Sequence, residues 1–132
     1  MSPPFGATPL LRAACALRLA RLGRKDPAAT QRALLSRLLR RAAGTRFGRA
    51  HGFDAIRDLA GYQARVKLRR YEDFWREWWQ PAHPALRDAT WPGLVPYFAL
   101  SSGTTSGTTK FIPVTRAMVA ANRGAALDTL AW

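Results

Sequence analysis

Residues 96–114 of the chain read PYFALSSGTTSGTTKFIPV, a polar stretch between two apolar runs. Pro96 to Leu100 and Phe111 to Val114 are apolar and aromatic, which predicts a strand on each side of the polar stretch. Gly103 and Gly107 can adopt backbone angles that are closed to other residues, so successive N–H groups can point into one concavity and bind a polyphosphate. The stretch therefore predicts a strand, a candidate phosphate-binding loop and a second strand.

The candidate phosphate ligands are hydroxyl groups, backbone N–H groups at the glycines, and one cation. Hydroxyls and amides donate hydrogen bonds, and a lysine ammonium adds a point charge. These residues are Ser101, Ser102, Gly103, Thr104, Thr105, Ser106, Gly107 and Lys110. The loop is not a Walker A loop, because three residues instead of four separate its glycines and the lysine leads into a strand. On composition alone, a hairpin turn without a ligand is the simpler interpretation.

Further segments accompany this loop in a fixed order. They are Thr45–Phe53, Tyr71–Phe74, Trp91–Gly93 and Tyr97–Leu100, which runs into the loop. Together with the extra residue Ser106 and with Phe111-Ile112-Pro113 after the lysine, they resemble the auxin-responsive promoter (Gretchen Hagen) family of acyl acid amido synthetases, a branch of the adenylate-forming enzymes. The resemblance spans about residues 34 to 115.

Members of that family are understood to activate a carboxylic acid with ATP and to pass the acyl group to an amine, often that of an amino acid. The resemblance implies ATP and Mg²⁺ as cofactors, with residues 101–107 at the phosphates and Lys110 as the catalytic cation. No Asp or Glu lies in or next to the loop in the sequence, so we assign no metal ligand. Lys67 and Thr109 stand where the family often has proline, and the second departure loosens the cradle. The acid and the amine are not specified by these residues.

The high net positive charge suggests the main alternative to an enzymatic function. The chain has 21 Lys and Arg against 8 Asp and Glu, a net charge of +13, and Lys25, Lys67 and Lys110 are its only lysines. The arginines are spread along predicted helices and form no tail, so we expect no specific nucleic-acid partner. The alternative to an enzyme is a basic amphipathic fragment, without catalytic activity, that binds a membrane surface or an acidic partner.

Cysteine content and the chain ends indicate the cellular setting. Cys15 is the only cysteine, so neither an intrachain disulfide nor a thiolate metal site is possible. We see no secretory signal and no apolar run of membrane-spanning length, and we expect a cytoplasmic protein. The resemblance covers only the N-terminal part of the family's enzymes, and the sequence ends in an apolar helical pattern. We therefore expect residues 1–132 to be an N-terminal fragment of a synthetase domain, inactive in isolation.

The predicted fold class is α/β, with N-terminal helices leading into the first strands of a larger adenylate-forming domain. Helical structure is predicted for residues 1–80, strand, loop and strand for 94–115, and the start of a helix for 116–132. Thr8-Pro9 and Asp26-Pro27 predict helix starts, and Gly23 and Gly44 predict the ends of those helices. The leucine stripes of both helices are interpreted as core faces. A loop over 45–53, short helices over 56–66 and 71–79, and a helix capped by Thr115 follow.

Several side chains within these elements receive structural interpretations. His51 is expected to be a structural hydrogen-bonding residue, and His83 has less support for any role. Trp75, Trp78 and Trp79 are expected to share one helix face and to anchor packing. Three acidic residues on that helix are expected to pair with nearby arginines, and no acid/base pair is assigned. The acids are Glu72, Asp73 and Glu77, and the arginines are Arg69, Arg70 and Arg76.

Overall fold

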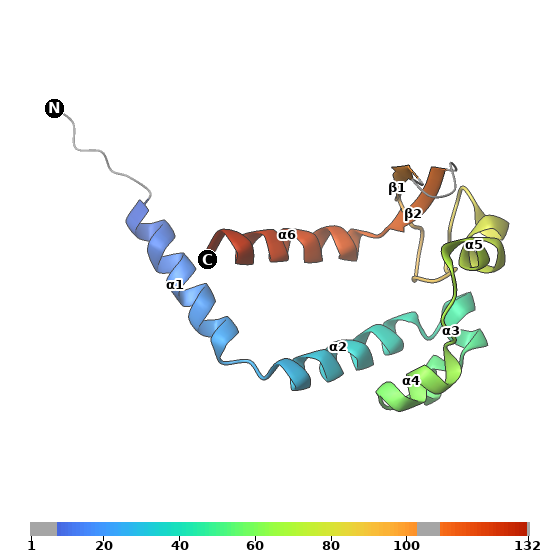
Figure 1. Cartoon of the computed structure of the whole chain (residues 1–132), viewed down its shortest axis with the longest axis horizontal. Helices are drawn as coiled ribbons and strands as arrows, with labels where there is room; N and C mark the ends of the chain where they lie inside the picture. Colours follow the sequence, from blue (N-terminus) through green and yellow to red (C-terminus); the bar gives the residue numbers. More distant parts are fainter. Residues whose placement is uncertain (1–7, 103–108, 132) are drawn as a thin grey trace.

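The computed structural model describes residues 8–102 and 109–131, and it is mostly helical with one small sheet (Figure 1). Its long helices are α1 (Thr8–Gly23), α2 (Pro27–Ala42) and α6 (Arg116–Ala131). The short helical segments are α3 (Arg46–Ala50), η1 (Phe53–Ala55), α4 (Leu59–Arg65), α5 (Tyr71–Phe74), η2 (Trp75–Trp79) and η3 (Gln80–Ala82). The strands are β1 (Tyr97–Ser102) and β2 (Thr109–Val114). This architecture confirms the predicted α/β class.

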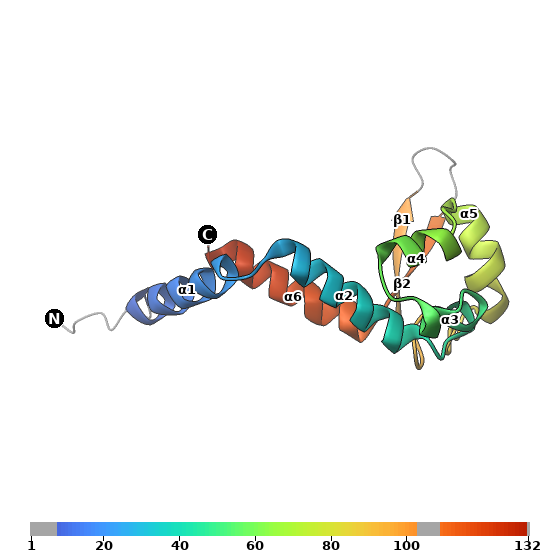
Figure 2. The same ribbon diagram turned by 90° about the horizontal axis from the view of Figure 1, so that it is seen from below.

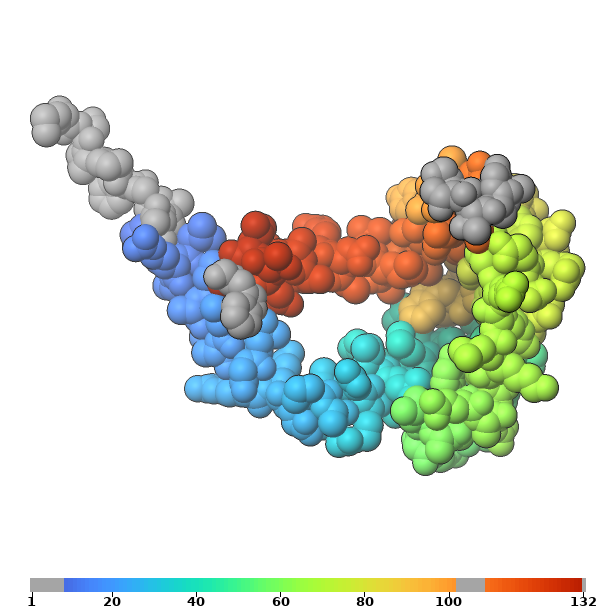
Figure 3. Space-filling view, in the orientation of Figure 1, coloured from blue at the N-terminus to red at the C-terminus, as the bar shows by residue number. Residues whose placement is uncertain are grey.

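The three long helices form an open frame. α6 runs back from the sheet until its C-terminal half reaches α1, where Arg18 donates a hydrogen bond to the carbonyl of Gly124 at 3.0 Å (Figures 1 and 2). The space-filling view shows an opening between α2 and α6 (Figure 3). The short elements and the sheet lie together at the other end of the frame from α1. Most packing between layers therefore occurs at that end.

The start of α2 follows directly from its sequence. The side chain of Asp26 accepts hydrogen bonds from the backbone N–H groups of Ala28 and Ala29, at 3.0 and 3.1 Å. Pro27, which has no N–H to satisfy, occupies the first helical position. The predicted start of this helix is confirmed.

The leucine stripes were predicted to be core faces, and this was wrong for most of α1 and for the first part of α2. Leu10 and Leu11 are 79% and 63% exposed, and on α2 only Leu39 and Ala42 are buried. The reason is that these helical segments have little to pack against among the described residues. Amphipathic spacing predicts which face can be buried, but a second layer has to cover it.

The main core cluster covers the end of α2. It consists of the buried residues Leu39, Ala42, Phe47, Phe53 and Ile56.

The predicted loop over 45–53 is wrong, because residues 46–50 form α3. Thr45 caps this helix by accepting a hydrogen bond from Gly48 N–H at 2.9 Å, and it is itself fully buried.

Contacts distant in sequence complete α3. The N–H groups of Arg46 and Phe47 donate to the carbonyls of Asp88 and Ala89, at 2.8 and 2.9 Å. Without these two carbonyls the first amides of α3 would lack partners, and a five-residue helix is not stable alone. The segment around residue 88 therefore determines a helix that the local sequence does not predict.

That segment contains the second core cluster, the buried residues Leu86, Ala89 and Val95. Its backbone doubles back, with Val95 N–H donating to Leu86 C=O at 2.9 Å. Gly93 takes a left-handed φ of +79°, and its N–H donates to the Asp88 carboxylate at 2.6 Å. Trp79, Ala82 and Phe98 pack against this cluster. The cluster thereby links the helical part of the chain to β1.

The tryptophans point in different directions. Helical structure continues from α5 into η2, which is a π-helical turn. Trp78 contacts the rings of Phe47 and His51, whereas Trp75 stacks on Phe111. The expected packing role is confirmed, but the single shared face is wrong, because a π turn changes the angular spacing of side chains.

β1 and β2 pair antiparallel, as the two predicted strands flanking the polar stretch require. Thr115 caps α6 as predicted, accepting a hydrogen bond from Met118 N–H at 3.1 Å. Across residues 8–102 and 109–131, no helix has the length and apolar character needed to cross a membrane.

Candidate phosphate-binding site

The register of the hairpin brings three of the predicted site residues together. Ser101 lies opposite Lys110, and Ser102 lies opposite Thr109, the last pair before the loop. The other predicted phosphate ligands, residues 103–107, lie outside the described residues. The described part of the site is therefore the end of the hairpin, with one ammonium group and the strand residues that lead into the loop.

Lys110 makes two contacts with α5. Its Nζ lies 2.9 Å from Glu72 Oε1 and 5.0 Å from the centroid of the Tyr71 ring. The Lys110 side chain is 30% exposed and that of Glu72 is 57% exposed. Both side chains are thus partly open to solvent.

The ion pair changes the titration of the carboxylate. The hydrogen bond from Lys110 is the largest reason that the pKa of Glu72 lies below its ordinary value of 4.5. A backbone hydrogen bond at Glu72 itself and the positive charges of Lys110 and Arg70 act in the same direction. Glu72 therefore stays ionised at neutral pH and offers Lys110 a full negative charge.

This pairing corrects the sequence analysis. Asp73 pairs with Arg76 at 2.8 Å and Glu77 with Arg69 at 2.9 Å, as predicted. Glu72 does not pair with a neighbouring arginine but reaches across to β2. An acidic side chain thus lies beside the end of the hairpin, although none is near the loop in the sequence.

Tyr71 fastens the same strand to the helix. Its hydroxyl accepts a hydrogen bond from Phe111 N–H at 2.8 Å and donates one to Phe111 C=O at 3.1 Å. Both backbone groups of Phe111 therefore point away from β1, toward α5. The Tyr71 hydroxyl satisfies both of these backbone groups. It thereby holds β2 against α5, whose residues Tyr71 and Glu72 contact Lys110.

Aromatic rings also pack against the side chain of Phe111. The Trp75 ring stacks on Phe111 with centroids 5.7 Å apart, and Phe98 approaches Phe111 edge-on at 6.4 Å. The His83 ring lies 5.3 Å from Trp75 and 5.5 Å from Phe111. His83 thus belongs to the packing that holds the hairpin. Sequence spacing gave no signal for these contacts, since they join segments far apart in the chain.

The model of the GH3 family N-terminal domain matches residues 18–131. The chain belongs to the GH3 family. This is the auxin-responsive promoter family that the sequence motifs resemble. Comparisons of the GH3 chain with curated proteins and with solved structures gave no match.

His51 of the GH3 chain has a structural environment, as predicted. Its Nδ1 lies 2.8 Å from Phe47 C=O, and its ring stacks on the Phe47 ring with centroids 4.1 Å apart. The ring also contacts Trp78 at 5.4 Å. These contacts place it beside the main core cluster and not at the end of the hairpin.

The described residues offer few ligands for a magnesium ion. Within residues 8–102 and 109–131, no group of three or more His, Cys, Asp or Glu side chains converges. Near the hairpin the single carboxylate of Glu72 is paired with Lys110. Magnesium in nucleotide sites often uses one or two carboxylates plus phosphate oxygens. The described residues do not by themselves form such a site, so we assign no metal ligand.

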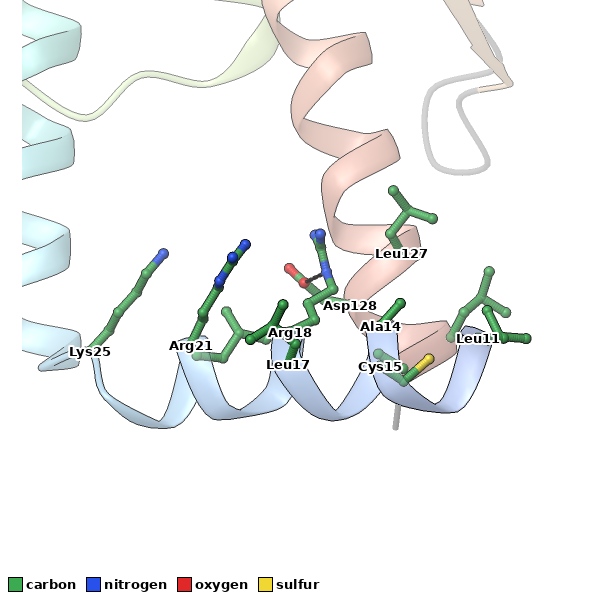
Figure 4. Close-up of a pocket in the computed structure, with 12 residues that line it drawn as sticks. Leu11, Ala14, Cys15, Leu17, Arg18, Arg21, Lys25, Leu127 and Asp128 are labelled. Carbon is green, nitrogen blue, oxygen red and sulfur yellow. Dashed lines mark hydrogen bonds and ion pairs between the residues drawn. The ribbon is translucent and has the colours of Figure 1, made fainter. Parts of the chain in front are cut away.

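A separate hollow of about 660 Å³ lies where α1 meets the end of α6 (Figure 4). Leucines line it, and the Arg18–Asp128 ion pair connects its two helices. Arg21 and Lys25 add positive charge on α1. The hollow contains no residue of the hairpin, so it is not part of the candidate phosphate site.

Proposed function

We propose that the hairpin of this GH3 chain is the ATP phosphate-binding element of an acyl acid amido synthetase. Such an enzyme adenylates a carboxylic acid and transfers the acyl group to an amine, such as that of an amino acid. The observation that supports this most directly is the placement of Lys110 at the end of the hairpin, opposite Ser101, in a chain of this family.

The chemistry asks for cations and hydrogen-bond donors. A carboxylate must approach a triphosphate that is itself strongly negative, and donors fixed in position offset that repulsion. Lys110 supplies the cation, and the strand pairing fixes where its backbone lies. Ser101 and Ser102 begin the run of hydroxyl and glycine residues that we propose to contact the phosphates. ATP supplies the adenylyl group and the pyrophosphate leaving group.

Nucleotide binding by the chain itself tests the first half of the proposal. We expect residues 1–132 to bind ATP at roughly millimolar strength, as followed by ³¹P NMR titration. Lys110→Met should weaken binding about fivefold, the upper range for a partly exposed charge pair. Lys67→Met is the matched control, because it removes the same charge from an exposed lysine elsewhere. Equal affinities of the two variants would refute a phosphate role for Lys110.

Adenylation is tested in a protein in which this N-terminal domain is joined to the remaining domains of a GH3 synthetase. Acid-dependent exchange of pyrophosphate into ATP should fall about a hundredfold with Lys110→Ala, since a cation at developing phosphate charge contributes roughly 3 kcal/mol. Residues 1–132 alone should form no detectable acyl adenylate. Unchanged exchange in the variant would remove Lys110 from the mechanism.

Salt dependence separates this proposal from the alternative of a basic fragment that binds a membrane surface or acidic partner. Binding through many arginines should collapse as salt screens exposed charges. ATP binding at the hairpin should instead depend on Lys110. Strong binding to anionic vesicles that salt abolishes, with no effect of Lys110→Met on ATP, would favour the alternative.

A further inference from the structure

We propose that Glu72 is a positioning residue of the phosphate site, which holds the Lys110 ammonium at the end of the hairpin and yields it when a polyphosphate binds. This inference rests on the proposed function of the hairpin. In this role the Glu72 carboxylate competes with phosphate for the Lys110 ammonium, and it thereby lowers the affinity for the nucleotide.

The geometry that carries the inference joins two elements. Glu72 and Tyr71 begin α5, and Lys110 lies on β2. The carboxylate is 2.9 Å from Nζ, and the Tyr71 ring lies 5.0 Å from the same atom. A cation placed beside an aromatic ring and a carboxylate has fewer accessible rotamers than a free lysine. The contacts therefore keep the ammonium beside α5, at the end of the hairpin, before any ligand arrives.

The position of Glu72 beside β2 depends on the neighbouring Tyr71 and not on the ion pair alone. The Tyr71 hydroxyl bonds both backbone groups of Phe111, the residue after Lys110. Two adjacent residues of α5 thus contact two adjacent residues of β2. The Tyr71–Phe111 contact involves no charge, so substitutions of Glu72 can be made without detaching the hairpin.

Glu72 is also the acidic residue of this helical segment that is directed at the hairpin. Asp73 pairs with Arg76, and Glu77 pairs with Arg69. The charged groups that face Glu72 are Lys110 from β2 and Arg70, the N-cap residue of α5. Asp73 therefore provides a control carboxylate, adjacent in sequence but paired elsewhere.

Exposure makes the exchange of partners feasible. The Glu72 side chain is 57% exposed, and exposed ion pairs contribute little stability. A triphosphate carries several charges and more acceptor oxygens than one carboxylate, so it competes effectively for the same ammonium. The Tyr71 ring can remain beside Lys110 in both states.

The ion pair is tested first in the free chain. Carboxyl-detected NMR titration of wild-type residues 1–132 should give a pKa of Glu72 below 4.5, and Lys110→Met should raise it toward that value. Lys67→Met should leave it unchanged. A pKa of Glu72 that does not respond to Lys110→Met would overturn the inference, whatever the function of the hairpin.

Competition is then tested by ATP titration followed by ³¹P NMR. Glu72→Gln, which preserves side-chain shape, should tighten ATP binding about threefold, within the range for an exposed ion pair. Asp73→Asn removes the same charge from the neighbouring residue and should have a smaller effect. The gain from Glu72→Gln should disappear in the Lys110→Met background. That dependence is a readout that a merely structural role would not produce.

The outcomes separate this inference from the proposed function. If Lys110→Met binds ATP as tightly as the wild-type chain does, the phosphate site is refuted and the inference with it. The same holds if the wild-type chain shows no ATP binding. If Lys110→Met weakens binding but Glu72→Gln behaves like Asp73→Asn, only the role of Glu72 is refuted. A gain from Glu72→Gln that persists without Lys110 would show general charge repulsion and would also overturn it.

Discussion

Replacement of Tyr71 by phenylalanine tests how the hairpin is held. The substitution keeps the ring that packs beside Trp75 and Lys110 and removes only the hydroxyl. Phe111 N–H and C=O, bonded at 2.8 and 3.1 Å, then lose their partner. Each such hydrogen bond contributes roughly 1 kcal/mol net, so the contact between β2 and α5 should lose about 1–2 kcal/mol. An opening equilibrium changes by about 5- to 30-fold for that free energy.

Amide hydrogen exchange measured by NMR gives this quantity at a single residue. We expect the Phe111 amide to exchange about 5- to 30-fold faster in Tyr71→Phe, because the hydroxyl is its acceptor. Tyr97→Phe is the matched control, since Tyr97 lies on β1 and is 57% exposed. Unchanged exchange at Phe111, or an equal acceleration in both variants, would refute the proposed attachment of the hairpin.

Three further substitutions, one of them a control, probe the packing away from the hairpin. Gly48→Ala should destabilise the chain by about 1–3 kcal/mol in urea unfolding, because a Cβ there would lie 2.0 Å from the carbonyl oxygen of Ala42. Gly124→Ala, also helical but with nothing within 4 Å of the new Cβ, should instead stabilise by up to about 1 kcal/mol; equal effects would contradict the close approach. His51→Ala should lower stability by about 1–2 kcal/mol through lost stacking and hydrogen bonding, yet leave ATP affinity within about twofold. A large loss of ATP affinity in a folded His51→Ala chain would instead place that histidine in the site.

Local signals in the sequence predicted the elements whose stabilising contacts are also local. Asp26-Pro27 begins α2 because the aspartate caps the amides two and three residues later. Thr115 caps α6 in the same way. The strands around the polar stretch pair because a short connection between apolar runs favours an antiparallel hairpin. For the two helix caps, residues two or three positions apart supply the contact, and for the hairpin the paired strands are neighbours in the sequence.

Features that depend on distant partners were missed or mispredicted. α3 was predicted as a loop. The carbonyls that satisfy its first amides belong to Asp88 and Ala89, which are too far away in the sequence for a local pattern to show the contact. The leucines of α1 were predicted to be buried, because periodicity shows an apolar face and not whether another element covers it. The tryptophan face was mispredicted because the sequence gave no sign of the π turn at η2.

The candidate site divides in the same way. The sequence by itself determined the two strands around the polar stretch and the family to which the chain belongs, and it named Lys110 as the candidate cation, because these depend on residue type and order. Only the tertiary structure decided what surrounds that cation. Glu72 and Tyr71 reach Lys110 through the docking of α5 on β2, and this contact joins segments that no local spacing relates. Charge pairing across a fold is set by where the backbone places each group, so the sequence could supply the partners but not the pairing.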